Sequence, residues 1–215
     1  MAGDTRTAGC PGAPVLSELK EVRVHELHPT QITVGMIEVH DKIHELEQMH
    51  KHQRRDFLAA HPLPAVHGVD DRLYITDHHH LGRALYEAGV EHAFIETEAR
   101  MTAPDTERFW QAMAAAHWAH PIDERGALRP FSEIPGHLQR MRDDVYRSLA
   151  GYVRAAGGYD KTSTPFAEFA WADWFRRRID VGTDRSSFAA AVSQATALAL
   201  SPAASHLPGF RGVAN

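Results

Sequence analysis

The stretch Tyr74-Ile75-Thr76-Asp77-His78-His79-His80-Leu81 decides the expected fold, because two structural patterns meet in it without a linker. Residues 72–76 carry the aromatic and β-branched side chains that are typical of a strand. From His78 onward, apolar side chains recur at spacings of three and four, as on the buried face of a helix. The stretch therefore predicts a strand that ends at Thr76 and is followed, after Asp77, by a helix over 78–87.

The residues on both sides of this stretch predict strands and helices in alternation. Apolar residues from Met36 to Leu46 recur at helical spacing, which predicts a helix over 34–50 with Thr33 as its N-cap. Short runs of alternating or β-branched residues predict the strands. These strands are expected at 22–27, 62–67, 72–76 and 90–96, with a hairpin turn at 68–71.

The second half of the chain has a different character and is mostly helical. Prolines and glycines make 119–137 a loop segment, and Asp184 is a suitable cap for the last helix. Helices are expected at 104–118 with Thr102 as a cap, at 141–156, from Thr164-Pro165 onward, and at 187–200. We therefore predict an α/β (α+β) fold with a disordered leader at 1–17, a mixed domain at 18–100 and a helical region at 101–210.

The composition limits the classes of partner. The chain has a formal net charge of −5 with histidine neutral, which argues against a protein that coats nucleic acid. No stretch approaches the length of an apolar membrane span. The single cysteine, Cys10, excludes both a disulfide within the chain and a cysteine-based zinc site. We expect a cytoplasmic protein without a nucleic-acid or membrane partner.

The turn at Asp77–His80 is the expected working site. Backbone N–H groups at a helix N-terminus are unpaired, and the helix dipole adds partial positive charge, so a phosphate or carboxylate binds well there. Asp77 is a suitable N-cap for the helix. Arg83, one turn further along, is expected to reach back toward the bound anion.

The three consecutive histidines of this turn indicate a phosphate or metal site. Successive side chains of a helix lie about 100° apart, so the three cannot bind one ion together. We expect His79 and His80 to face a pocket and His78 to contact another segment. A transition metal held by Asp77, His79 and His80 is one hypothesis. Two histidines four residues apart on the preceding helix would extend such a site: His40 and His44.

The strand, the Asp-His-His-His turn and the following helix resemble the central Asp-Gly-His-x-Arg-type motif of the ParB/sulfiredoxin superfamily. The wider chain resembles the ParB-like nuclease family of that superfamily over residues 19–210. The opening segment of the family is similar to Leu27-His28-Pro29-Thr30-Gln31, Val34-Gly35, Glu38-Val39 and Lys42. Its helical tail is similar to Tyr146-Arg147-Ser148-Leu149-Ala150, Gly157-Gly158-Tyr159 and Phe166-Ala167-Glu168-Phe169-Ala170-Trp171-Ala172.

The resemblance implies a ParB/sulfiredoxin-like fold with a nucleotide phosphate over the helix start. By this resemblance, Asp77 and His79 match the Asp and His of the motif. Glu38 lies where related free-serine kinases hold a catalytic carboxylate, and Lys42 is a charge partner for it or for a phosphate. Leu81 replaces the phosphate-binding arginine of the motif. No cysteine lies near the motif, so the reductase chemistry of sulfiredoxin is not expected.

Three functions stay open at this point. The first is an enzyme of phosphoester chemistry, either a nucleotide-dependent phosphotransferase or a metal-dependent, nuclease-like phosphoesterase, with a nucleoside di- or triphosphate and Mg²⁺ as cofactors. The second is a nucleotide- or DNA-binding regulatory module of the ParB type, and the third is a metal-dependent small-molecule enzyme without a nucleotide. The expected partner is a small-molecule or nucleotide substrate, and the oligomeric state is open. The expected catalytic residues are Glu38, Asp77 and His79, and the expected phosphate contacts are Lys42, His80 and Arg83.

Overall fold

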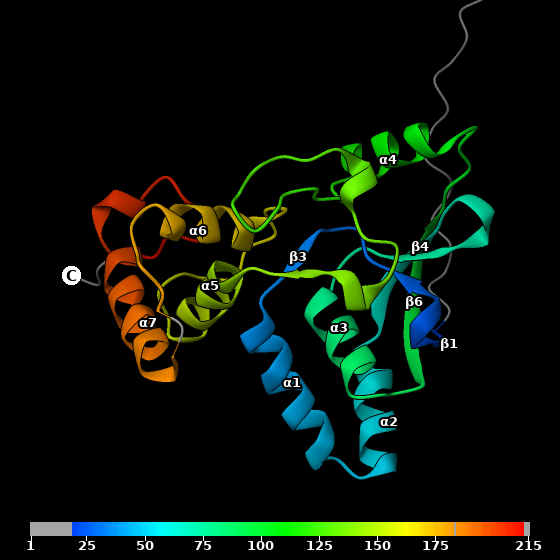
Figure 1. Ribbon diagram of the computed structural model, residues 1–215, viewed down its shortest axis with the longest axis horizontal. Helices are drawn as coiled ribbons and strands as arrows, with labels where there is room; N and C mark the ends of the chain where they lie inside the picture. The colour runs from blue at the N-terminus through cyan, green and yellow to red at the C-terminus, as the bar shows by residue number, and fades with distance from the viewer. Residues whose placement is uncertain (1–18, 183, 213–215) are drawn as a thin grey trace, which may run out of the picture.

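The structure is a computed structural model that describes residues 19–182 and 184–212. The predicted leader at 1–17, with Cys10, lies outside the described residues. Within the described part, a central mixed sheet and seven α-helices form a mixed α/β fold (Figure 1). This confirms the predicted fold class. Over the same residues, no helix combines the length and apolar character needed to cross a bilayer.

The central sheet has five strands in the order β1-β6-β4-β5-β2. The predicted hairpin is present, because β4 and β5 pair antiparallel and place Ala65 opposite Ile75. β6 runs parallel to β4 and antiparallel to β1, while β2 runs parallel to β5. The strands are β1 (Leu19–Arg23), β2 (Leu27–His28), β4 (Leu63–His67), β5 (Leu73–Ile75) and β6 (His92–Arg100).

The single strand predicted at 22–27 is wrong. One turn of 3₁₀ helix at Val24–Glu26 divides this segment. Val22 and Val24 are both buried, and the backbone N–H of Val24 donates to the carbonyl of Glu91 at 3.0 Å. The turn redirects the chain, so β1 pairs at one edge of the sheet and β2 at the other.

The helix predicted over 34–50 with Thr33 as its cap also requires correction. Thr33 belongs to the short strand β3 (Thr33–Val34), and Gly35 is the N-cap of α1 (Met36–Gln48). The first turn of α1 uses an external acceptor, because the N–H of Met36 donates to Oδ1 of Asp143 at 2.9 Å. A second helix, α2 (Lys51–Ala60), follows at once. Its N-cap is His50, whose N–H donates to the side chain of Gln53 at 3.0 Å.

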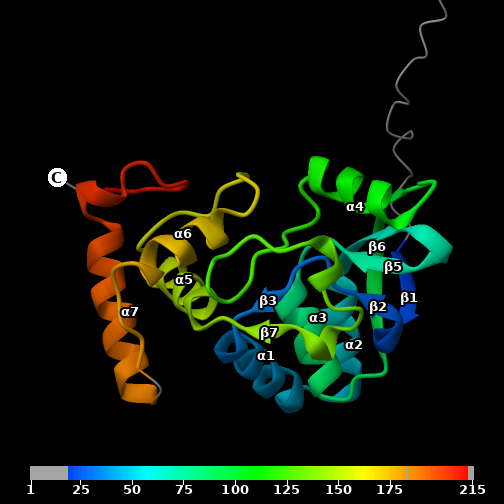
Figure 2. The ribbon, with the colours of Figure 1, turned by 45° about the horizontal axis from the view of Figure 1, so that its top comes forward.

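The second half of the described chain is mostly helical, as predicted. α4 (Thr106–Ala115) is capped by Asp105 instead of Thr102, and Asp184 caps the last helix as expected. β7 (Arg142–Asp143) pairs in parallel with β3, and Figure 2 shows this pair between the sheet and the C-terminal helices. The C-terminal helices are α5 (Val145–Ala155), α6 (Ala167–Arg176) and α7 (Arg185–Ala199).

Apolar packing brings the two halves of the chain together at α1 and α5. One buried cluster joins the sheet with α1 and α3 (His79–Glu87), and another joins α5, α6 and α7. Glycine and serine allow close contact between the halves, because a Cβ atom added to Gly35 would lie 2.9 Å from the Cα of Ser148. The Ser148 hydroxyl accepts a hydrogen bond from the N–H of Ile37 at 3.2 Å. The start of α1 is therefore fixed against α5.

Candidate active site

The Asp77 turn joins β5 to α3, but Asp77 is not the N-cap of the helix. α3 begins at His79, and its N-cap is His78, which has a left-handed backbone (φ 58°). Asp77 is exposed, and its Oδ1 accepts a hydrogen bond from the N–H of His78 at 2.7 Å. The predicted cap is wrong by one residue, because the chain turns at His78 before the helix starts. His78 contacts the carbonyl of Pro62 at 3.2 Å, so it meets another segment as expected.

His79 is a buried structural side chain. It is 4% exposed, and its Nε2 accepts a hydrogen bond from the N–H of Thr30 at 3.1 Å. The ring also bonds the backbone of Ile75, and burial lowers the pKa of His79 from 6.5 to about 3. The imidazole is therefore neutral and joins β5 to the segment after β2.

His80 is also neutral and holds the start of α1. Its Nε2 accepts a hydrogen bond from the N–H of Gly35 at 2.9 Å. Burial lowers the pKa of His80 well below 6.5, and the positive charge of Arg147 lowers it further. Nε2 also lies 3.8 Å from Oε1 of Glu38. This contact is not an ion pair, because a neutral imidazole that accepts at Nε2 carries no charge and has no proton there to donate.

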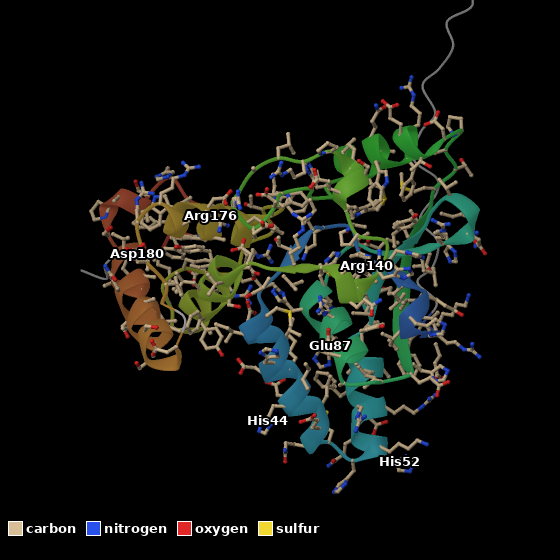
Figure 3. All side chains as sticks on the ribbon, in the orientation of Figure 1. His44, His52, Glu87, Arg140, Arg176 and Asp180 are labelled. Carbon is tan, nitrogen blue, oxygen red and sulfur yellow. The ribbon has the colours of Figure 1, made fainter. Side chains whose placement is uncertain are left out.

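The geometry does not assemble the metal site expected from Asp77, His79 and His80. A histidine binds a metal through a ring-nitrogen lone pair, and Nε2 of both histidines already accepts a backbone N–H. In the ranges that the structure describes, no group of three or more His, Cys, Asp or Glu side chains is arranged to hold a metal ion. His40 and His44 are exposed, and Figure 3 shows His44 on the outer face of α1.

Arg83 does not reach back toward the helix start. Its guanidinium donates to the carbonyls of Leu138 and Met141 at 3.1 and 2.7 Å, and it pairs with Glu87 at 2.7 Å. Leu81 occupies the position of the motif's phosphate-binding arginine, and Arg83 lies about 200° around the helix from it. Arg83 therefore points to another side of α3, toward the segment that follows α4. The expectation that Arg83 contacts a bound anion is therefore wrong, and its role is to attach 138–141 to α3.

Glu38 lies on the buried side of α1, where it faces a cavity. Its Oε1 is buried and has no hydrogen-bond partner among the described residues. Burial raises the pKa of the Glu38 carboxyl above 4.5, while the charges of Arg147, Lys42 and Arg154 lower it. A buried carboxylate oxygen without a donor is costly for the folded protein, which indicates a group that receives a hydrogen bond from a ligand.

Arg147 on α5 is the second charged residue of this cavity with buried, unpartnered polar atoms, and the prediction from sequence missed it. The residue is 4% exposed, and neither Nε nor Nη1 has a hydrogen-bond partner among the described residues. Its Cζ lies 3.5 Å above the ring of Phe169, and Nη2 lies 3.7 Å from Glu168. Burial lowers the pKa of Arg147 to about 10, so the guanidinium stays positively charged at neutral pH.

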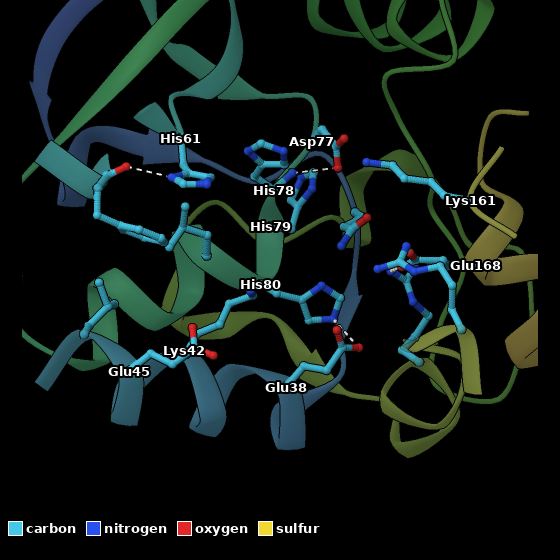
Figure 4. Close-up of a pocket in the computed structure, with 16 residues that line it drawn as sticks. Glu38, Lys42, Glu45, His61, Asp77, His78, His79, His80, Lys161 and Glu168 are labelled. Atoms are coloured by element: carbon cyan, nitrogen blue, oxygen red, sulfur yellow. Dashed lines mark hydrogen bonds and ion pairs between the residues drawn. The ribbon is translucent and has the colours of Figure 1, made fainter. Parts of the chain in front are cut away.

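Glu38 and Arg147 face one cleft, and Figure 4 shows the part of it that lies between α1 and the Asp77 turn. The cleft consists of two adjoining cavities of about 290 and 500 Å³. The first cavity lies between α1 and the Asp77 turn, and the second lies between the 159–169 segment and residues 116–118. Six residues line both cavities: Gln31, Asp77, Arg147, Arg154, Lys161 and Glu168.

Three further cations line the cleft. Lys42 lies one helical turn beyond Glu38 on α1 and lines the first cavity. Arg154 lies two turns after Arg147 on α5 and pairs with Glu168. Lys161 points toward Asp77 in Figure 4. Arg154 and Lys161, together with Arg147, give the common wall of the two cavities cationic groups that suit an anion.

A signal for the missed arginines is present in the sequence. Arg147 interrupts an apolar helix face that includes Leu149, Ala150 and Val153. Arg154 follows at a spacing of seven residues, which places both arginines on one helix face. A charged residue on a buried face needs a partner or a function.

The fold and cleft define a mixed α/β protein with a cleft between a sheet-containing half and a helical half. Comparisons with known proteins agree with this class. A family model described as "Putative ParB-like nuclease" matches residues 20–177. The crystal structure of protein Atu1540 from Agrobacterium tumefaciens matches with a TM-score of 0.84 and 42% identity, over 92% of this chain and 98% of that chain. The chain belongs to the ParB-like nuclease family. No curated protein matches it.

Proposed function

We propose that the protein is an enzyme of phosphoester chemistry that acts on a small phosphorylated substrate. The observation that carries this proposal is that Glu38 and Arg147, on one cleft, each have buried polar atoms without a hydrogen-bond partner among the described residues. A guanidinium with free N–H groups is well suited to bind phosphate oxygens in bidentate fashion. A carboxylate with a free oxygen is suited to accept the proton of a hydroxyl group or a water molecule.

In the proposed reaction, Glu38 accepts the proton from the attacking hydroxyl or water. The oxygen then forms a bond to phosphorus as the bond from phosphorus to the leaving oxygen breaks. Arg147, Arg154 and Lys161 stabilise the negative charge on the phosphoryl group during this step. The raised pKa of Glu38 favours this role, because a base whose pKa lies nearer to neutral accepts a proton more readily.

A nucleotide cofactor would bring Mg²⁺ with its phosphates. Mg²⁺ sites in phosphoryl-transfer enzymes use one or two carboxylates together with phosphate oxygens. Asp77 fits this requirement, since it is exposed and lines both cavities. Asp77 would hold the ion, and the ion would neutralise phosphate charge.

The cleft favours a small substrate over duplex nucleic acid. The unpartnered atoms of Arg147 are buried, so a phosphate must enter the cavity to reach them. A cavity of about 290 Å³ has the size of a small-molecule site. The net charge of −5 also repels a duplex on average.

Turnover of a panel of phosphate monoesters and nucleotides, with and without an acceptor alcohol, tests the proposal. Replacing the base, Glu38→Gln, is expected to lower kcat/KM by about 10²–10⁴-fold. Glu47→Gln on the same helix is the matched control, since Glu47 is exposed and does not line the cleft. Equal activity of the wild-type and Glu38→Gln proteins would contradict the assignment of the base.

A further inference from the structure

The N-cap of α1 is Gly35, which has no side chain that could cap the helix. The first N–H groups of a helix have no acceptor within the helix and need one from elsewhere. At α1 the acceptors come from three segments that are distant in the sequence. The N–H groups of residues 35–37 donate, in order, to His80 at 2.9 Å, Asp143 at 2.9 Å and Ser148 at 3.2 Å.

The use of glycine at this cap follows from the close contact between α1 and α5. A Cβ atom added to Gly35 would lie 2.5 Å from the backbone nitrogen of Ser148. One turn further along both helices, an added Cβ atom on Gly151 would meet the carboxylate of Glu38. Residues three apart lie on the same face of a helix, so the same two faces meet at both contacts. This packing fixes the position and the rotation of α1 relative to α5.

The hydrogen bond between Ile37 and Ser148 joins the chain neighbours of the two proposed site residues. Glu38 follows Ile37 on α1, and Arg147 precedes Ser148 on α5. Ser148 is fully buried, and Asp143 is exposed, but neither side chain lines either cavity. These two residues therefore fix the geometry of the site from outside the cleft.

We infer that Ser148 and Asp143 are positioning residues for the proposed base. By accepting N–H groups in the first turn of α1, they hold the Glu38 carboxylate at a fixed place relative to Arg147. A base must lie within hydrogen-bonding reach of the proton that it accepts, so a small displacement of Glu38 lowers the rate. This inference rests on the proposed function and adds to it the residues that set the base against the phosphate ligand.

Ser148→Ala, made both in the wild type and in Glu38→Gln, tests the positioning role in the full chain. The kcat is measured with the most active compound of the phosphoester panel, and the affinity for pyrophosphate is measured by calorimetry. We expect kcat to fall about 10–100-fold in the wild-type background, as for a displaced catalytic group. The affinity for pyrophosphate should be unchanged, because alanine suits a helix interior and leaves Arg147 in place.

The Glu38→Gln background distinguishes positioning from a general loss of structure. Ser148→Ala should cause no further loss there, because the group that it positions is already absent. A merely structural effect would lower kcat in both backgrounds. Ser193→Ala is the matched control, since Ser193 is exposed on α7 and its hydroxyl donates to the carbonyl of Ala189 on the same helix.

Asp143 provides a second test that does not depend on a buried substitution. Asp143→Ala removes the acceptor of the Met36 N–H, so it should lower kcat while the affinity for pyrophosphate stays the same. Asp143→Asn keeps a side-chain oxygen that can accept this N–H, so it should retain the wild-type kcat. This test stands even where Ser148→Ala fails to fold.

The outcomes separate this inference from the proposed function. A wild-type kcat in Ser148→Ala and Asp143→Ala, or an equal loss from Ser148→Ala in both backgrounds, would overturn the positioning role and leave the proposed function standing. If Glu38→Gln is as active as the wild type, the assignment of the base is wrong and the positioning role is overturned with it. If the wild type turns over no compound of the panel, both are overturned.

Discussion

Gly151 on α5 lies directly against the carboxylate of Glu38 on α1. A Cβ atom added to Gly151 would lie 2.6 Å from Cδ of Glu38. Because Gly151 has no side chain, the carboxylate of Glu38 can occupy this position. Since α5 also carries Arg147, one helix both makes room for the proposed base and supplies the proposed phosphate ligand.

Gly151→Ala is expected to displace the carboxylate and lower activity while the fold is retained. Alanine is the better helix former by about 1 kcal/mol, which offsets part of the steric cost. The measurement is kcat/KM together with Tm. Gly136→Ala is the control, because no atom would lie within 4 Å of its added Cβ atom. Unchanged activity in Gly151→Ala would show that catalysis does not depend on the position of the Glu38 carboxylate.

Glu38→Gln is expected to stabilise the protein at neutral pH although it lowers the proposed activity. The folded state raises the pKa of Glu38, so it disfavours the charged form relative to the unfolded chain. The free energy of unfolding of the wild type therefore falls as the pH rises from 4.5 through the folded-state pKa of Glu38. Glutamine carries no charge, so the Glu38→Gln variant does not lose stability in this way. Urea unfolding at pH 7.5 measures the gain, and a lower midpoint for Glu38→Gln would contradict it.

Acid should destabilise the protein below pH 6.5 because buried histidines are held neutral. Burial lowers the pKa of His79 and of His120 from 6.5 to about 3. Between these values the unfolded chain binds protons that the folded protein does not, so stability falls as the pH falls. At pH 5 each group would lower the free energy of unfolding by about 2 kcal/mol.

His120→Phe tests this effect, and His44→Gln is its control. The free energy of unfolding of each variant is measured at pH 7.5 and at pH 5. His120 packs between the rings of Phe166 and Phe169, so phenylalanine is a close replacement. His120→Phe should show a smaller loss between the two pH values than the wild type. His44 is exposed, and its variant should lose as much as the wild type. An equal loss in all three proteins would rule out His120 as a source.

His79→Ala should weaken the fold more than it weakens the ligand site. Without the imidazole, the buried N–H of Thr30 loses its acceptor, at a cost of about 1–3 kcal/mol. Urea unfolding and the affinity for phosphate separate the two effects. A variant with wild-type stability and no phosphate affinity would instead make His79 a direct ligand.

The sequence predicted the central part of the fold well because local patterns decide it. The strand over residues 73–75, its hairpin and the helix from His79 follow from side-chain periodicity alone. The 3₁₀ turn that divides residues 22–27 was not predictable in this way. It depends on β1 pairing with β6 and β2 pairing with β5, at opposite edges of the sheet. The break after Gln48 depends on the His50–Gln53 cap, which is a local signal that the periodicity hides.

The site was predicted only in part. Family resemblance pointed to Glu38, Lys42 and Asp77, and the structure places all three on the cleft. His79 and His80 also line the first cavity, as expected, but backbone hydrogen bonds occupy Nε2 of both. The cation on which the proposed function depends, Arg147, comes from α5, more than a hundred residues from Glu38 in the chain. Contacts of this kind between distant segments cannot be read from local patterns.

The affinity for pyrophosphate, measured by calorimetry on the wild type, Arg147→Met and Arg140→Met, tests the central claim most directly. Arg147→Met keeps an apolar stem over Phe169 but removes the unpartnered N–H groups, while Arg140 is exposed and does not line the cleft. We predict that the wild type and Arg140→Met bind equally and that Arg147→Met binds about 10–100-fold more weakly, as expected for loss of charged hydrogen bonds of 1.5–3 kcal/mol. Equal affinity of all three proteins would contradict the assignment of Arg147 as the phosphate ligand.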